Sequence, residues 1–189
     1  MTRSRHVRAL AVAVVALGLW AWGAGTARAI QPTLVEIKKE KDGTLTYVFK
    51  ITIDDSVVVQ GGKDAPNPDF FTIYNVAGLV AGSNQQPDGW TFSTADEGVT
   101  PFRGGKAMIN PVDTKDIPNV TWSYAGKEPL KGPKEVAGFS VRTKVENTVT
   151  GEYGVQVTRL KAGTLNPKDD RESKEARIDA VTTPEVKAK

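Results

Sequence analysis

Cysteine is absent from the 189-residue sequence, and histidine occurs only once, at position 6. A chain without cysteine forms no disulfide, no thiolate metal site and no thiol nucleophile. His6 lies in a segment that we expect to be removed, so the mature chain cannot build a Ser-His-Asp triad or an imidazole metal site. These absences exclude thiol catalysis, Ser-His-Asp catalysis and catalysis by a metal bound to thiolate or imidazole from the mature protein.

The first 29 residues have the three parts of a secretory signal peptide. A basic start precedes an apolar run over residues 9–25, and Ala27-Arg28-Ala29 is the small-x-small pattern that signal peptidase accepts. The apolar run is shorter than the roughly 20 residues that cross a bilayer, although an uncleaved anchor is the alternative. We therefore predict cleavage after Ala29 and secretion to the periplasm or the medium, with no membrane association afterwards.

Positive charge is concentrated in the predicted signal. The whole chain has 25 Lys and Arg against 22 Asp and Glu, and four of these arginines lie in residues 1–29. The remainder has 21 basic against 22 acidic residues, a formal net charge of −1. A nearly neutral domain lacks the excess of basic residues with which proteins bind nucleic-acid phosphates, so no nucleic-acid partner is expected.

Residues 44–54 carry the clearest strand pattern. Apolar residues occupy every odd position and polar residues occupy the even ones, with Val48 as the exception. A period of two places one face of a strand on a core and the other in water. Asp42-Gly43 is a turn signal, so residues 33–39 are predicted to pair with this strand as a hairpin.

The same alternation returns near the end of the chain. Phe139, Val141 and Val145 share one face of a predicted strand, and residues 153–157 alternate in the same way. The polar segment 146–151 between them predicts a second hairpin. Shorter strands are expected at residues 70–75, 120–124 and 177–181.

The rest of the sequence favours loops over helices. Segments 60–68, 82–89 and 104–118 are rich in turn-forming residues, and no stretch has a convincing amphipathic helical period. This pattern predicts an all-β fold, an antiparallel β-sandwich with long irregular loops, with a barrel as the alternative. Residues 30–181 are expected to form this single domain, and the polar residues 182–189 a disordered tail.

Three phrases between residues 70 and 126 carry a family resemblance: FFTIY, PDGWTF and PNVTWSYAG. In these phrases and their order the chain resembles bacterial secreted all-β proteins of the PEP-CTERM class, over roughly Thr44 to Leu160. The class also carries a C-terminal Pro-Glu-Pro motif, a hydrophobic span and a basic end, whereas this chain ends TPEVKAK. The resemblance therefore implies a secreted, non-catalytic β domain. It implies neither the anchoring step nor any catalytic residue.

Carboxylates are the main acid/base groups left for catalysis. They fall at predicted strand ends or in loops, where Asp and Glu are usually turn formers or solvated charges. No spacing among them requires the carboxylate pair of a glycoside hydrolase. No catalytic residue is assigned, and a carboxylate-based glycoside hydrolase is the least favoured function. These strand-end and loop carboxylates are Asp54, Asp55, Asp64, Asp69, Asp88, Asp96, Glu97, Asp113 and Asp116.

One loop offers oxygen ligands for calcium. Asp64, Asn67 and Asp69 place three oxygen-bearing side chains within six residues, and Ca²⁺ binds such loop oxygens. The loop lacks the Asp-x-Asp-x-Asp-Gly run, and its two prolines suit a rigid turn equally well. No cofactor is expected apart from Ca²⁺ at this loop.

Two tryptophans raise the question of sugar binding, because a flat aromatic ring can stack on a sugar. Trp122 shares a strand face with Val120 and Tyr124, so a core position is expected. Trp90 follows a Pro-Asp-Gly turn, where it either caps one end of the sandwich or lies exposed as a ligand-binding residue.

Together these observations predict an exported, non-catalytic β-sandwich with a structural or a surface- and matrix-interaction role. Extracellular polysaccharide or matrix components are the expected partners. A calcium-dependent or lectin-like carbohydrate-binding module is the alternative.

Overall fold

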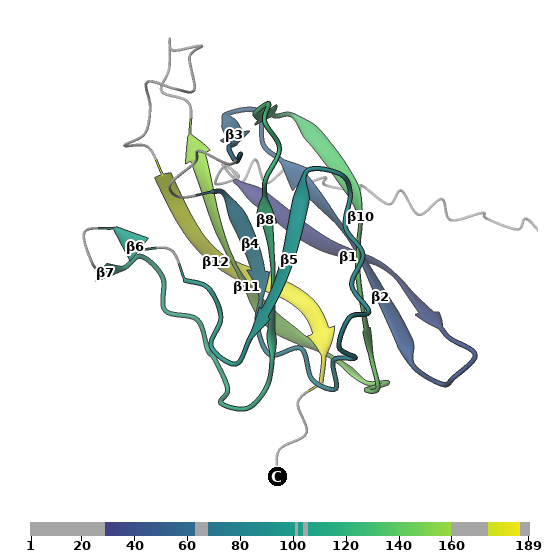
Figure 1. Cartoon of the computed structure of the whole chain (residues 1–189). Coiled ribbons are helices and arrows are strands. Elements are labelled where there is room, and N and C mark those ends of the chain that lie inside the picture. Colours follow the sequence, from purple (N-terminus) through teal and green to yellow (C-terminus); the bar gives the residue numbers. More distant parts are fainter. Residues whose placement is uncertain (1–28, 63–67, 101, 104–105, 160–173, 186–189) are drawn as a thin grey trace, which may run out of the picture.

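The computed structural model describes residues 29–62, 68–100, 102–103, 106–159 and 174–185, and every regular element in them is a β-strand (Figure 1). The strands are β1 (Ile30–Lys39), β2 (Leu45–Ile53), β3 (Val57–Val59), β4 (Phe70–Ile73), β5 (Trp90–Ala95), β6 (Phe102–Arg103), β7 (Lys106–Ala107), β8 (Asn119–Tyr124), β9 (Leu130–Lys131), β10 (Lys134–Thr143), β11 (Thr148–Arg159) and β12 (Lys174–Pro184). Within the described part of the chain, no helix is present that could span a membrane.

Two antiparallel sheets make up the body of the fold. Sheet A has the order β1-β2-β10. Sheet B has the order β5-β8-β4-β11-β3-β9, and β12 pairs with β11 at its edge. A short β6–β7 hairpin lies outside both sheets. The two sheets pack face to face, which confirms the predicted all-β sandwich.

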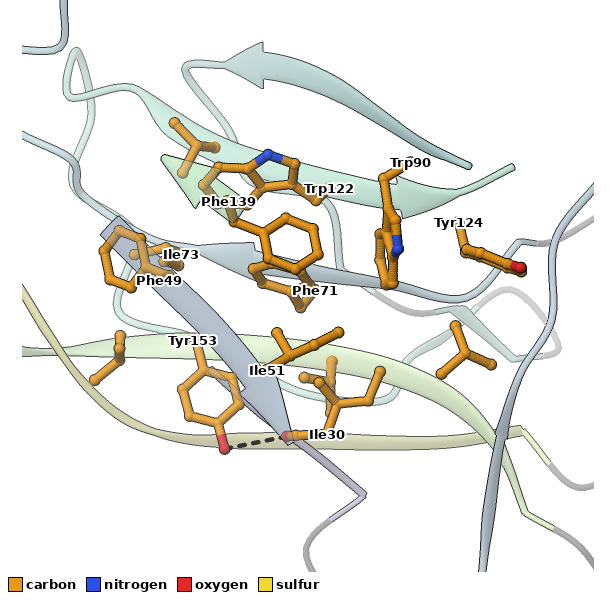
Figure 2. Close-up of a cluster of buried hydrophobic side chains, with 14 of the residues drawn as sticks. Ile30, Phe49, Ile51, Phe71, Ile73, Trp90, Trp122, Tyr124, Phe139 and Tyr153 are labelled. Atoms are coloured by element: carbon orange, nitrogen blue, oxygen red, sulfur yellow. Dashed lines mark hydrogen bonds between the residues drawn. The ribbon is translucent and has the colours of Figure 1, made fainter. Parts of the chain in front are cut away.

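An aromatic cluster fills the space between the sheets (Figure 2). Trp122 of β8 is fully buried, and its ring stacks on Phe71 of β4 with the centroids 5.0 Å apart. Phe139 reaches the same cluster from sheet A, meeting Phe71 edge-on at 5.1 Å. The prediction that Trp122 belongs to the core is therefore confirmed.

The first predicted hairpin is confirmed in detail. Strands β1 and β2 pair from Ile30↔Ile53 to Lys39↔Leu45. Gly43 in the connecting turn has a φ of 81°, a left-handed conformation that glycine adopts without steric cost. The Asp42 carboxylate accepts a hydrogen bond from the Thr44 backbone N–H at 3.1 Å, which closes the turn.

The second predicted hairpin is wrong. Strand β10 pairs with β2 in sheet A, whereas β11 pairs with β12, β4 and β3 in sheet B. The short segment between β10 and β11 therefore crosses from one sheet to the other. The sequences of both strands alternate between apolar and polar residues because each strand turns one face toward the core. The two strands reach this shared core from opposite sheets.

The predicted disordered tail needs correction over residues 182–185, whereas residues 186–189 lie outside the described residues. Residues 182–184 belong to β12, where Thr183 lies opposite Val149 of β11. Thr183 is buried and packs against Gly151, whose missing Cβ would lie 2.5 Å from the Thr183 hydroxyl. The backbone N–H of Glu185 donates to the Asn147 carbonyl at 2.8 Å, which extends the ordered chain by one residue. Polar composition was misleading because the strand alternates buried and exposed threonines.

The shorter predicted strands are present as β4, β8 and β12. The predicted signal lies outside the described residues except for Ala29. Ala29 is buried, and its carbonyl accepts a hydrogen bond from the Asp54 N–H at 3.2 Å. Signal cleavage and export stay predictions.

Candidate functional site

A groove of about 520 Å³ lies on the outer face of sheet A, away from the core. Its lining is polar apart from one valine and one glycine. It consists of Lys38, Glu40, Thr46, Val48, Ser83, Gln85, Gly138, Ser140 and Arg142.

The floor of the groove follows from the register of the three strands. Thr46 of β2 lies between Lys38 of β1 and Arg142 of β10, so the three side chains form a row across the sheet. Val48 lies opposite Ser140 in the neighbouring row. Because residues paired across strands share a face, the outward positions of three strands meet in one surface.

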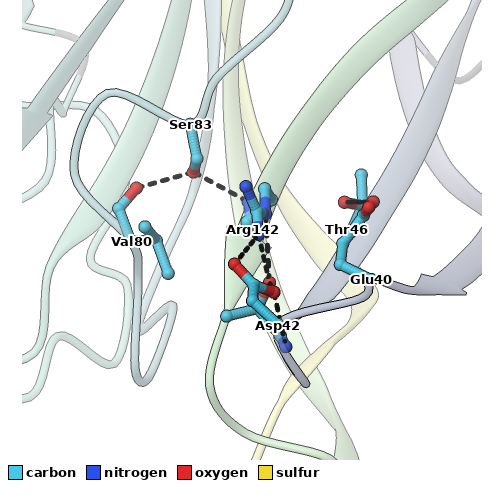
Figure 3. A network of polar contacts seen from close by, with 7 residues as sticks. Glu40, Asp42, Thr46, Val80, Ser83 and Arg142 are labelled. Carbon is cyan, nitrogen blue, oxygen red and sulfur yellow. Dashed lines mark hydrogen bonds and ion pairs between the residues drawn. The ribbon is translucent and has the colours of Figure 1, made fainter.

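A loop docked on the free edge of β10 forms one wall. The backbones of Gln85 and Ser140 exchange two hydrogen bonds, both 2.9 Å long. The Ser83 hydroxyl donates to the Val80 carbonyl at 2.6 Å and accepts the Arg142 backbone N–H at 2.9 Å (Figure 3). These bonds hold Ser83 and Gln85 beside the sheet and cover part of an otherwise unpaired strand edge.

A β-bulge shapes the floor at Gly138. The pairing of β10 with β2 shifts between Ala137 and Phe139, and Gly138 has a φ of 97°. A Cβ built on Gly138 would meet no atom within 4 Å. The bulge therefore needs glycine for its backbone conformation, and the glycine leaves the groove open.

Arg142 is held by the turn between β1 and β2. Its Nε donates to the Thr44 hydroxyl at 3.0 Å, and Nη2 donates to the same hydroxyl at 2.6 Å and pairs with the Asp42 carboxylate (Figure 3). Hydrogen bonds from the Thr44 hydroxyl and N–H, followed by that from Arg142, lower the pKa of Asp42 to about 2. The guanidinium is thus fixed in place before any ligand arrives.

The groove supplies hydrogen-bonding groups rather than a catalytic pair. Glu40 is the only carboxylate among the described residues that line it, and it accepts the Thr46 hydroxyl at 2.5 Å. Lys38 and Arg142 supply cationic donors, and Gln85 offers an exposed amide. Such a set can bind a polar ligand by hydrogen bonds.

The proposed calcium ligands fall mostly outside the described residues. Asp64 and Asn67 lie there, so their positions stay untested. Asp69 is fully buried, and its carboxylate accepts bonds from the Gln60 N–H at 2.7 Å and the Thr158 hydroxyl at 3.0 Å. It also pairs with Lys174. In the described part of the chain, no group of three or more acidic or histidine side chains could hold a metal.

Trp90 lies in the core rather than on the surface. Only 6% of its surface is exposed, and its ring meets Phe71, Tyr124 and Phe139 edge-on at 5.1–5.8 Å. A ring packed in this way offers little face to a sugar, which favours the capping interpretation.

Two loop carboxylates, Asp54 and Asp113, hold turns and loops. Asp54 accepts the Ser56 N–H at 3.2 Å in the β2–β3 turn. Asp113 accepts the Gly98 N–H and the Asn119 side-chain amide, both at 2.8 Å. These contacts tie the segment before β8 to the sheet and give both carboxylates structural roles.

Sequence reasoning missed the groove because four separate segments form it. One signal was present: Val48 breaks the polar side of the β2 alternation, and in the structure it lines the groove. An apolar residue on an otherwise polar strand face can indicate a contact surface.

Searches against models of known protein families and against curated proteins give no match for this chain. The resemblance of residues 44–160 to the PEP-CTERM class therefore stays a prediction. Evidence for a function comes from the groove and its side chains.

Proposed function

We propose that this protein is an exported, non-catalytic β-sandwich that binds an extracellular polysaccharide through the groove of sheet A. Its role in the cell is structural, as a component of the surface or the matrix. The observation that carries the proposal is the polar groove across three strands, with Arg142 fixed in it and no carboxylate pair in its described lining.

A polysaccharide suits the chemistry of this lining. Sugar hydroxyls both donate and accept hydrogen bonds, and the groove offers both kinds of partner through Gln85, Ser140 and Glu40. Val48 adds an apolar contact for the C–H face of a ring. The groove lies on the solvent side of the sheet, where an extended polymer can reach it.

Binding is favoured over cleavage. Hydrolysis of a glycosidic bond uses two carboxylates on opposite sides of the sugar, and Glu40 alone cannot fill both roles. Glu40 already accepts the Thr46 hydroxyl. The mature chain also lacks histidine and cysteine, which removes the other common nucleophile systems.

The test is retention of the mature protein on a panel of neutral and acidic polysaccharides. Lys38→Ala combined with Gln85→Ala removes two exposed groove side chains, and Lys131→Ala on β9 of sheet B is the matched control. Loss of two hydrogen bonds of about 0.7 kcal/mol each predicts roughly tenfold weaker binding for the double variant. The Lys131→Ala control should bind the polysaccharide with the same affinity as the unmodified protein.

Two outcomes would refute the proposal. The first is that the unmodified protein binds none of the polysaccharides. The second is that the double variant and the Lys131→Ala control bind equally well, which would place the contact outside the groove.

A further inference from the structure

A buried ion pair in sheet B takes no part in the groove. Asp69 precedes β4 and is fully buried, and Lys174 begins β12 with 17% of its side chain exposed. The Lys174 ammonium contacts Oδ1 of Asp69 across 105 residues of sequence. Strand β11 lies between β4 and β12, so the contact bridges the strands on either side of it.

The two oxygens of the Asp69 carboxylate have different surroundings. Oδ2 accepts hydrogen bonds from the Gln60 N–H at 2.7 Å and from the Thr158 hydroxyl at 3.0 Å. Oδ1 faces the Lys174 ammonium. The backbone of Asp69 is also fixed, because its N–H donates to the Gln60 carbonyl at 2.8 Å and its carbonyl accepts the Tyr124 N–H at 2.8 Å.

This arrangement has the parts of an acyl-transfer site. Two donors aimed at one oxygen stabilise the negative charge that develops when a nucleophile adds to the carboxyl carbon. The amine is held against the same carboxyl group, so the reaction is intramolecular. Burial disfavours the charged form of Asp69 and raises its pKa to about 6, which eases proton transfer from the ammonium to Oδ1.

We propose that Lys174 and Asp69 condense into an intramolecular amide that covalently joins β12 to the start of β4. The ammonium first passes a proton to Oδ1, which leaves a neutral amine and a neutral acid. The Nζ lone pair then attacks Cγ, and the C=O electron pair moves to Oδ2, where the Gln60 N–H and the Thr158 hydroxyl receive it.

Collapse of this intermediate completes the step. The Oδ2 electrons re-form the C=O bond, the Cγ–Oδ1 bond breaks, and Oδ1 takes a proton from nitrogen and leaves as water. One amide and one water form from one amine and one acid, with no oxidant or cofactor. The product replaces the fully buried Asp69 carboxylate and the partly exposed Lys174 ammonium with a neutral group, which removes the cost of desolvating these charges.

An amide cross-link would give this cysteine-free chain a covalent bond between distant segments. No disulfide can cross-link this protein, and a bond between residues 69 and 174 closes a long loop. Closing a long loop restricts the unfolded chain, as a disulfide does. The amide would also fasten β12, which among the described strands pairs with β11 alone.

The test is mass spectrometry of the folded mature protein after incubation at neutral pH. We expect an intact mass lower than the sequence mass by one water. Proteolytic digestion should release a branched peptide that joins residues 69 and 174. Lys174→Arg keeps the positive charge but lacks the amine, so it should show the full mass, whereas Lys131→Arg should still lose water. Thr158→Val removes one donor to Oδ2 and should lower the cross-linked fraction.

A full intact mass for the unmodified protein would overturn the proposal, whether or not the variants fold. Water loss located in a linear peptide would also overturn it. Asp42-Gly43 and Asp88-Gly89 are the sequences at which such a loss by cyclisation is expected. The branched peptide is therefore the decisive observation.

Discussion

At the scale of the residue, Asp42 connects a turn to the groove. Its carboxylate accepts the Thr44 N–H and the Thr44 hydroxyl, the latter at 2.7 Å, and it pairs with Arg142. These bonds favour the charged carboxylate and hold its pKa near 2. Protonation of Asp42 therefore weakens the hydrogen bonds that close the β1–β2 turn and the ion pair that holds the Arg142 guanidinium in the groove.

Replacing Asp42 with asparagine should destabilise the protein in a pH-dependent way. The pKa of Asp42 is about 2 in the folded state against an ordinary value of 3.8, so the carboxylate stabilises the fold above 3.8 and loses this effect as the pH falls toward 2. The difference in unfolding free energy between the unmodified protein and Asp42→Asn should be constant near neutral pH, fall as the pH drops from 3.8 toward 2, and disappear below that. High salt should reduce it, because Asp42 is exposed.

Urea unfolding over a series of pH values measures this difference. Asp88→Asn, at an exposed loop carboxylate, is the matched control and should show little change. An Asp42→Asn effect of equal size at pH 2 and pH 7 would contradict the assigned role.

At the scale of the element, β12 shows how a polar strand can be part of a core. Thr182 is exposed and Thr183 is buried against Gly151. Thr183→Leu should overfill this contact and cost about 1–3 kcal/mol of stability. Thr182→Leu in the same strand should change the unfolding free energy by less than about 0.5 kcal/mol. Thermal or urea unfolding compares the two, and equal effects would count against the ordering of residues 182–184.

The sequence was sufficient to predict which face of a strand is buried, but not which strand lies beside it. The alternation in β2 and the Asp42-Gly43 turn together specified the first hairpin, because a short turn leaves adjacent strands little choice of partner. The connection between β10 and β11 is also short, yet it crosses between sheets. The two-residue period of a strand shows which side chains are buried, but it does not show with which strand, or in which sheet, that strand pairs.

Strand β5 was not predicted because its pattern is weak. Of its six residues only Trp90 is buried, since β5 is an edge strand of sheet B. The groove escaped prediction for a related reason. Its floor depends on the register of β1, β2 and β10, and its wall depends on a loop that docks through backbone bonds. In the sequence, only Val48 on the polar face of β2 indicates the groove.

At the scale of the whole molecule, the predicted export has a structural consequence. Ala29 and Ile30 are both buried, and the Ile30 carbonyl accepts the Tyr153 hydroxyl at 3.4 Å (Figure 2). The bond that we expect signal peptidase to cut therefore lies inside the folded sandwich. We therefore expect cleavage after Ala29 to come before β1 pairs with β2 at the edge of sheet A.

Processing should be visible in the exported protein. We expect N-terminal sequencing of material from the periplasm or the medium to begin at Ile30. Isoelectric focusing should give a value well below the 9.0 of the whole chain, because four arginines leave with residues 1–29. A product that retains the first 29 residues would contradict cleavage and favour the anchored alternative.

We propose that the outer face of sheet A binds a polysaccharide, and this contact can be located on the protein. Chemical-shift mapping by NMR locates the contact when the labelled mature protein is titrated with an oligosaccharide from a polysaccharide that the protein retains. We expect the largest shifts at the backbone amides of four groove residues, Gln85, Gly138, Ser140 and Arg142. Shifts confined to sheet B, or to the loops that hold Asp88 and Asp113, with the groove amides unchanged, would contradict it.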